Sequence, residues 1–254
     1  MAGHVVSLAR HPVKGFTPEP LAKVTLKTGE HFPGDRLFAV EDGPSGFDPD
    51  VPEHISKMAF TVLAKLPDVA AIRTKWNDDD GTLTARHPGF GEITIDLDDT
   101  GGLSVFATWL SSVLAGQTRG SLKVLTAPDS FRFMDSRTGY VSIINLASVR
   151  DFETKIGRPV DSARFRGNIM VDGWPAWSEL EMAGQDITIG GARLRGIKPI
   201  ERCRAPDVNP DTAERDIEVV SLLREHYGHF NCGLYVEVIE GAEVMTGDVA
   251  QSVG

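Results

Sequence analysis

Short runs of alternating apolar and polar residues dominate the chain, and most are bounded by glycine or proline. Alternation with a period of two predicts half-buried β-strands, because successive side chains of a strand point to opposite faces. In the first half the predicted strands are 5–9, 22–26, 36–40, 70–75, 82–85, 92–97 and 121–126. In the second half they are 141–144, 163–171, 186–189, 192–197, 234–239 and 243–245. Hairpin-length turns join many of them, which favours antiparallel pairing.

Four segments place apolar residues at helical spacing instead: 54–66, 103–114, 146–156 and 216–226. The third also has boundary signals, because Asn145 is a favourable N-cap and Gly157 a favourable C-cap. Strands outnumber helices, so the sequence predicts a mainly β fold with helices (α+β), organised as a mostly antiparallel β-barrel. A change of composition at 127–130 predicts two domains, 1–127 and 128–254.

Composition and charge narrow the function. The 254 residues suffice for one large or two small domains. Lysine and arginine number 26 against 36 acidic residues, a net charge of −10, which disfavours binding to nucleic acid. The N-terminus has no basic region ahead of an apolar stretch, and no apolar run approaches the ~18 residues that span a bilayer. We therefore expect a cytoplasmic protein with no membrane contact. Its two cysteines are expected to be free thiols.

Cys203 lies in the most suggestive stretch of the chain. The strand pattern before it breaks at Gly196, as a β-bulge would, and Pro199 removes a ladder donor, so we expect Cys203 in a loop at a strand end. Arg202 and Arg204 flank the thiol, and neighbouring cations favour the thiolate, which suits a nucleophile or a soft-metal ligand. On local sequence alone, an ordinary buried cysteine explains the residue equally well.

Two other cationic segments accompany this cysteine. On an extended chain Arg164 and Arg166 share one face, and two guanidinium groups could grip phosphate or carboxylate, although solvated surface arginines are the simpler interpretation. Lys14 follows a strand end and precedes Gly15, which lets a ligand approach the backbone. In an acidic chain, cations gathered at strand ends near a cysteine suit an anionic, metal-bearing cofactor.

A series of motifs occurs in one order along the second half. They are VSIINLAS (141–148), RFRGNI (164–169), WSE (177–179), IG (189–190), RC (202–203), VNPDT (208–212), GLYVEV (233–238) and GD (247–248). This series resembles the MOSC domain, the C-terminal domain of molybdenum cofactor sulfurases. In the first half, HPVKG (11–15) and GDR (34–36) resemble the β-barrel module that precedes it in many members. The resemblance implies a MOSC-type β-barrel, similar to that of pyruvate kinase, behind an N-terminal MOSC β-barrel module.

Within this family the chain is similar to the mitochondrial amidoxime-reducing component. The resemblance implies a molybdenum cofactor, molybdopterin with its molybdenum held by a protein cysteine, and Cys203 matches that cysteine. The positions that match the cofactor pocket are Lys14, Arg36, Arg166 and Asn168, with Asn209 on the loop beyond the cysteine. Relatives often carry an acid just before the strand that opens the MOSC domain, where this chain has Arg137, with Asp135 two residues earlier.

The resemblance implies an oxidoreductase that reduces N-hydroxylated compounds at the N–O bond. Because the chain has no flavin or nicotinamide motif, and two cysteines cannot hold a four-cysteine iron–sulfur cluster, we expect a separate electron-donor protein. A flavodoxin, a ferredoxin or a b-type cytochrome would serve. Two alternatives stay open: persulfide sulfur transfer by Cys203 as a nucleophile, and a non-enzymatic carrier of the molybdenum cofactor.

Overall fold

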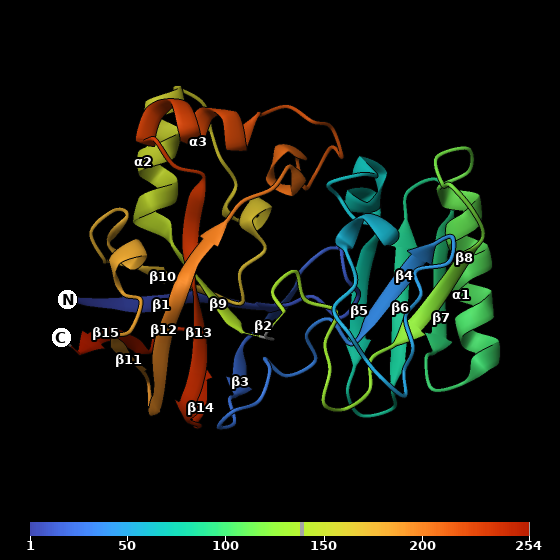
Figure 1. Cartoon of the computed structure of the whole chain (residues 1–254), viewed down its shortest axis with the longest axis horizontal. Helices are drawn as coiled ribbons and strands as arrows, with labels where there is room; N and C mark the ends of the chain where they lie inside the picture. Colours follow the sequence, from blue (N-terminus) through green and yellow to red (C-terminus); the bar gives the residue numbers. More distant parts are fainter. Residues whose placement is uncertain (138–139, 254) are drawn as a thin grey trace.

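The computed structural model describes residues 1–137 and 140–253, which form two units lying side by side (Figure 1). One unit is a closed β-barrel that includes the first and last strands, and the other combines small sheets with a helix. Among the described residues, no helix is both long and apolar enough to cross a bilayer.

Seven strands close the barrel by hydrogen bonding in a ring. Around the ring they are β10 (Ile169–Asp172), β9 (Val141–Asn145), β13 (Asn231–Glu240), β12 (Ala192–Glu201), β11 (Asp186–Ile189), β15 (Val249–Val253) and β1 (Ala2–Arg10), which pairs again with β10. Only β9 and β10 run parallel among these neighbours. Apolar residues of these strands pack with the buried Trp174 to form the barrel core. The predicted mainly β fold with helices, organised around a β-barrel, is confirmed.

Both ends of the chain contribute to the barrel. Strand β1 lies at the N-terminus, but it pairs with β10 and β15 from the second half. β2 (Glu19–Leu21) follows β1 in sequence and adds to its edge. A further pairing joins distant segments, since β3 (Lys23–Thr25) pairs with β14 (Glu243–Met245). The domains 1–127 and 128–254 stay a prediction, and the strand order shows that residues 2–10 hydrogen-bond within the barrel.

The second unit is built around its own apolar core. Its sheets are β4 (Phe38–Asp42) with β8 (Leu122–Thr126), and β5 (Arg73–Asn77) with β6 (Thr82–His87) and β7 (Gly91–Asp96). The helix α1 (Thr100–Val113) begins at the N-cap Asp99 and buries Phe106 and Leu110 against these sheets. It lies along the outer side of the unit (Figure 1).

Two helices pack beside the barrel strands at its upper end in Figure 1. Helix α2 (Leu146–Ile156) begins at Asn145, whose side chain accepts a hydrogen bond from the Ala147 N–H, and ends at Gly157 in the left-handed conformation, as predicted. Helix α3 (Val219–Tyr227) ends at Gly228 in the same way. Short 3-10 turns complete the structure: η1 (Lys57–Ala59), η2 (Pro67–Ala71), η3 (Ser162–Phe165), η4 (Ser178–Glu181) and η5 (Ala205–Asp207).

The helix predicted over 54–66 is wrong. The segment holds only the short turn η1 and a single turn after Val62, and between them the chain becomes extended at Phe60, which pairs with Glu41 in β4. The Thr61 N–H donates to the Val40 carbonyl at 2.9 Å. Because Phe60 and Thr61 are fully buried by this pairing, tertiary packing overrides the helical spacing of the apolar residues.

Candidate functional site

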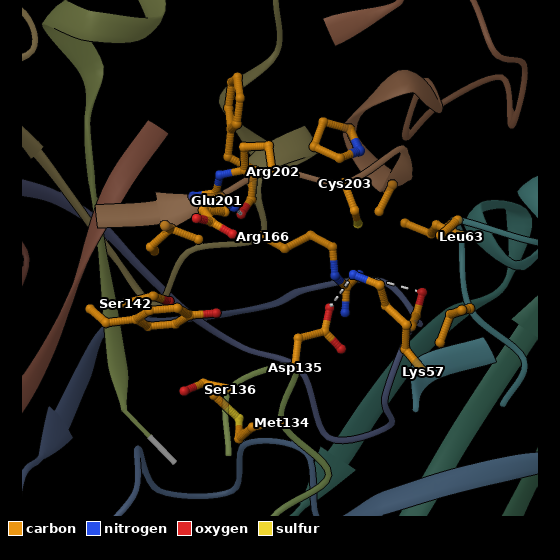
Figure 2. Close-up of a pocket in the computed structure, with 18 of the residues that line it drawn as sticks. Lys57, Leu63, Met134, Asp135, Ser136, Ser142, Arg166, Glu201, Arg202 and Cys203 are labelled. Carbon is orange, nitrogen blue, oxygen red and sulfur yellow. Dashed lines mark hydrogen bonds and ion pairs between the residues drawn. The ribbon is translucent and has the colours of Figure 1, made fainter. Parts of the chain in front are cut away.

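A cavity of about 490 Å³ lies between the two units and is lined by residues from both. The sulfur of Cys203 faces its interior from one side and the carboxylate of Asp135 from the other, with the ends of Lys57 and Arg166 between them (Figure 2). The volume falls in the range of small-molecule and cofactor sites, roughly 300–1,000 Å³.

The end of strand β12 delivers Cys203 to this cavity. The pairing of β12 with β13 shifts register after Gly196, as the predicted bulge requires. A Cβ at Gly196 would lie 2.0 Å from the Met182 carbonyl oxygen, so only glycine fits there. The strand ends at Glu201, and Cys203 occupies the following loop, half-buried and free of any disulfide.

The lining of the cavity is strongly cationic. Its charged side chains are seven lysines and arginines (Lys14, Arg36, Lys57, Arg164, Arg166, Lys198 and Arg202) against two acids (Asp135 and Glu201). This excess contrasts with the net charge of −10 for the whole chain. A concave surface lined by one sign of charge attracts ligands of the other sign, so the cavity suits an anion.

Lys14 and Lys57 share the carboxylate of Asp135. The Lys14 Nζ lies 2.6 Å from one Asp135 oxygen, and the Lys57 Nζ lies 3.4 Å from the other. Burial opposes ionisation of Asp135, but the two lysines outweigh it and hold its pKa well below the usual range. Burial also disfavours the charged form of Lys57, yet Asp135 and the Cys203 sulfur together raise the pKa of its ammonium group. Lys57 therefore stays charged beside the sulfur.

Arg36 and Arg166 lie close together on the cavity wall. Both residues adopt the left-handed conformation, with φ of 51° and 52°, which is uncommon outside glycine. Arg36 pairs with the buried Asp35 and approaches the Arg166 carbonyl at 3.4 Å. The Arg166 guanidinium donates to the carbonyls of Gly15 and Phe16, and burial beside Arg36 lowers its pKa. These contacts bind the barrel to the second unit at the cavity.

The prediction that Arg164 and Arg166 share one face of a strand is wrong. Residues 162–165 form the turn η3 and not a strand, so the two side chains diverge. Arg164 is buried and pairs with Asp216 at 2.8 Å. Arg202 likewise serves the local structure, because its guanidinium donates to the carbonyls of Cys232 and Phe165. Of the two flanking arginines predicted to favour the thiolate, Arg202 is thus engaged with the backbone, and the exposed Arg204 pairs with Asp207 at 3.5 Å.

The two predicted asparagines lie beside the cavity-lining segments and bind the backbone. The side-chain oxygen of Asn168 accepts from the N–H and hydroxyl of Ser142, at 3.1 and 2.7 Å, and the residue is fully buried. The side-chain oxygen of Asn209 accepts from the backbone N–H of Asp211 and Thr212. The structure therefore brings together Cys203, Lys14, Arg36 and Arg166 on the cavity wall, and gives both asparagines contacts that shape loops.

Sequence reasoning missed Lys57 and left Asp135 unresolved against Arg137. The structure places Asp135 on the cavity wall, whereas Arg137 is not among the described residues that line the cavity. Lys57 lies in the segment wrongly predicted as helix, for which only the spacing of the apolar residues was considered. Within the described residues, no group of three or more histidines, cysteines, aspartates or glutamates is placed to hold a metal ion.

Two family models match this chain and together cover nearly all of it. The MOSC N-terminal beta barrel domain matches residues 2–119, and the MOSC domain matches residues 130–251. The second match contains Asp135, Arg166 and Cys203, and the first contains Lys14 and Arg36. The cavity therefore lies where segments from both matched regions meet.

Part of the chain is similar to molybdenum cofactor sulfurases of flies. The protein from Drosophila melanogaster is 33% identical over 97 residues, which is 37% of this chain and 12% of that protein. The protein from Drosophila persimilis is 32% identical over 116 residues, which is 42% of this chain and 14% of that protein. The similarity thus spans a small part of those longer proteins.

Two solved structures are similar to this chain at low sequence identity. The YuaD protein from Bacillus subtilis is 15% identical with a TM-score of 0.47, over 98% of this chain and 94% of that chain. YiiM from Geobacillus stearothermophilus is 18% identical with a TM-score of 0.34, over 45% of this chain and 54% of that chain.

Proposed function

Because this chain is a MOSC domain protein with the N-terminal barrel module of that family, we propose that its cavity binds the molybdenum cofactor through Cys203 and reduces N-hydroxylated compounds. The observation that carries the proposal is the position of the Cys203 sulfur, which faces a cavity with seven cationic side chains in an acidic chain.

The residues of the cavity fit that cofactor. A thiolate is the soft ligand that such a metal requires, and a pterin phosphate needs cations. Lys14, Arg36 and Arg166 would hold the phosphate end, and Cys203 would hold the metal. When bound, the cofactor supplies two-electron chemistry at an N–O bond, and the protein contributes binding, orientation and electrostatics.

The protein's own residues would act on the substrate by charge and by exclusion of water. Lys57 keeps its proton, so its Nζ can donate a hydrogen bond to an oxygen of the bound substrate. Asp135 stays ionised between the two lysines and orients that ammonium group. Leu63, Ala205 and Pro206 provide an apolar part of the wall, which favours the hydrocarbon body of a substrate over water.

The contrast between the two cysteines bears on the alternative of sulfur transfer. Cys232 is fully buried, and burial raises the pKa of its thiol to about 12. It therefore cannot act as a second thiol that accepts or resolves a persulfide on Cys203. Persulfide transfer would therefore rely on Cys203 as the one reacting thiol and on an acceptor outside this chain. In the cofactor-carrier alternative, the same cavity would bind the cofactor but catalyse no reaction.

We also propose that the electrons come from a separate protein, of the flavodoxin, ferredoxin or b-type cytochrome class. The sequence contains neither a flavin nor a nicotinamide motif, so direct reduction by NADH or NADPH is not expected. A dye donor can replace the partner in the assay.

The test measures molybdenum, pterin and turnover on protein isolated from a molybdate-supplemented host. We expect both components to be bound, and an amidoxime to be reduced with a dye donor. Cys203→Ser should lose molybdenum and turnover, whereas Cys232→Ala should keep both. Bound molybdenum without turnover by any donor would favour the carrier. Absence of molybdenum together with a persulfide on Cys203 would favour sulfur transfer.

A further inference from the structure

The loop beyond Cys203 lines the cavity with Ala205 and Pro206 and then continues as a tight hairpin, whose Val208 packs into the core of the second unit. Val208 and Arg215 pair across the hairpin, and the Asn209 N–H donates to the Glu214 carbonyl at 2.7 Å. The side-chain oxygen of Asn209 satisfies two N–H groups at the tip, as an Asx turn does. Asn209 therefore fixes the hairpin that ends at Arg215.

This hairpin holds one residue in an unfavourable backbone conformation. Ala213 has φ of 60°, in the left-handed region that favours glycine. Its N–H donates to the Asn209 carbonyl at 2.9 Å, so the turn is closed tightly. Such a conformation persists only where the surroundings determine it, which indicates that the path of the chain into Arg215 is constrained.

The guanidinium of Arg215 joins segments from the two units. Its Nη2 donates to the carbonyls of Leu63 and Ala64, at 2.8 and 2.9 Å, and its Nη1 donates to the Arg204 carbonyl at 3.0 Å. Leu63 and Ala64 belong to the first half of the chain and line the cavity, as does Cys203 next to Arg204. One side chain thus connects the segments that flank the sulfur.

The geometry of residues 62–66 makes these carbonyls available. The N–H groups of Lys65 and Leu66 both donate to the Val62 carbonyl, which closes a single turn. A continuing helix would direct the next N–H groups to Leu63 and Ala64, but Pro67 has no N–H and the chain turns away into η2. The planar fork of an arginine can reach two adjacent carbonyls and a third acceptor together, whereas a lysine ammonium is a single point.

A second contact between the same hairpin and the first half is weaker. Arg73 donates to the Pro210 carbonyl at 3.0 Å and pairs with Asp211 at 3.2 Å, with side-chain exposures of 50% and 79% for Arg73 and Asp211. Exposed ion pairs contribute little, because water screens them. Arg215 is therefore the principal polar connection on this side of the cavity, beside the apolar packing of Val208 on the core of the second unit.

We propose that Arg215 is a latch that fixes the width of the cavity beside Cys203 and so limits the size of molecules that reach the sulfur. Arg215 is a positioning residue, since it acts through the backbone of the Cys203 loop. The latch itself does not depend on the cofactor. Its consequence, that Arg215 restricts the N-hydroxylated substrates to slender ones, rests on the proposed function.

The test compares two thiol reagents of different size on the cofactor-free full chain. Iodoacetamide and a maleimide carrying polyethylene glycol are reacted with Cys203 at one pH, and the ratio of the two rates is taken, because the ratio cancels changes in thiolate reactivity. Arg215→Gln should raise the bulky-to-small ratio by about tenfold or more, since three hydrogen bonds to backbone are lost. Arg215→Lys should give an intermediate ratio.

Arg204→Gln is the matched control, because it removes a cation next to Cys203 while keeping the backbone carbonyl that Arg215 binds. Its ratio should equal that of the wild type. An unchanged ratio in folded Arg215→Gln, or in folded Arg215→Lys if the glutamine variant does not fold, would overturn the latch. Absence of bound molybdenum in the wild type would overturn the proposed function and leave this result unaffected.

If both hold, the loaded Arg215→Gln protein should gain kcat/KM on a bulky amidoxime relative to a small one. If the ratio of kcat/KM for the bulky and the small amidoxime equals that of the wild type, Arg215 does not determine which substrates react. That result would overturn the proposed effect of Arg215 on specificity.

Discussion

The ammonium group of Lys14 lies 2.6 Å from the carboxylate of Asp135, although the two residues are 121 positions apart. Lys14 also donates to the Phe133 carbonyl at 2.9 Å, and only 4% of its side chain is exposed. Burial lowers the pKa of this lysine, in opposition to Asp135. The pair therefore connects the loop that follows β1 to the segment that precedes β9, at the wall of the cavity.

The Lys14–Asp135 pair predicts a particular acid dependence of stability. The pKa of Asp135 lies below its ordinary value of 3.8, so its contribution is present above that value and is lost as the pH falls further. Asp135→Asn should be less stable than the wild type at pH 7 and should lose less stability between pH 5 and 3. Urea unfolding across this range measures both. Glu53→Gln, which removes an exposed carboxylate, should follow the wild-type curve.

His11 predicts a second pH dependence, in a higher window. Burial, reinforced by Arg166 and Arg36, lowers the pKa of this fully buried imidazole to about 3 from 6.5. The unfolded chain takes up a proton at His11 below pH 6.5 and the folded chain does not, so stability falls from there towards pH 3. The loss is on the order of 5 kcal/mol for a shift of this size.

The variant that isolates this effect is His11→Gln. Its free energy of unfolding should vary less than that of the wild type between pH 7 and 4, measured by urea at each pH. Parallel curves for the two proteins would show that His11 titrates normally. His226→Gln, on the exposed side of helix α3, is the matched control and should leave the slope unchanged.

The strand that delivers Cys203 was predictable because its signals are local. A glycine that interrupts alternation and a proline at the strand end produce the same bulge and loop in the structure, since they act through backbone sterics alone. Helix α2 was predictable for the same reason, with a cap at each end. Local physical rules fixed these elements without reference to the rest of the chain.

The side-chain positions on the cavity wall could not be predicted from local signals in this way. Lys57 reaches Asp135 only because Phe60 pairs with β4, and that pairing depends on residues distant in sequence. Arg164 was expected beside Arg166, but Asp216 draws it away. Charge partners in three dimensions decide these positions, and neither spacing nor periodicity encodes them.

The two thiols should differ sharply in reactivity. Cys203 faces the cavity, whereas Cys232 is fully buried in the core between α2 and α3, with a raised pKa. Ellman's reagent at pH 8 should therefore titrate one thiol in the native protein and two in urea, and Cys203→Ser should react only after unfolding. A rapid second equivalent in the native state would show that the Cys232 core opens locally.

The retention of cofactor should depend unequally on the cavity cations. Arg166 donates to backbone carbonyls and, within the described part of the chain, forms no ion pair with a carboxylate, although Asp35 and Asp135 lie near enough to act on its charge. Its charge therefore remains available to an anion. Lys14 is already neutralised by Asp135. Loss of a charge-assisted hydrogen bond costs about 1.5–3 kcal/mol, or tenfold or more in affinity. Arg166→Gln should therefore retain less molybdenum and pterin than Lys14→Met.

Three measurements test this ranking of cofactor retention. Arg166→Lys keeps the charge while losing the guanidinium fork, so it should retain more cofactor than Arg166→Gln. Lys123→Met removes an exposed lysine of β8, outside the cavity, and should match the wild type. The melting temperature of each variant separates loss of fold from loss of binding. If Lys14→Met lost more cofactor than Arg166→Gln at equal stability, the lysine would be the principal anchor and Asp135 would have to release it on binding.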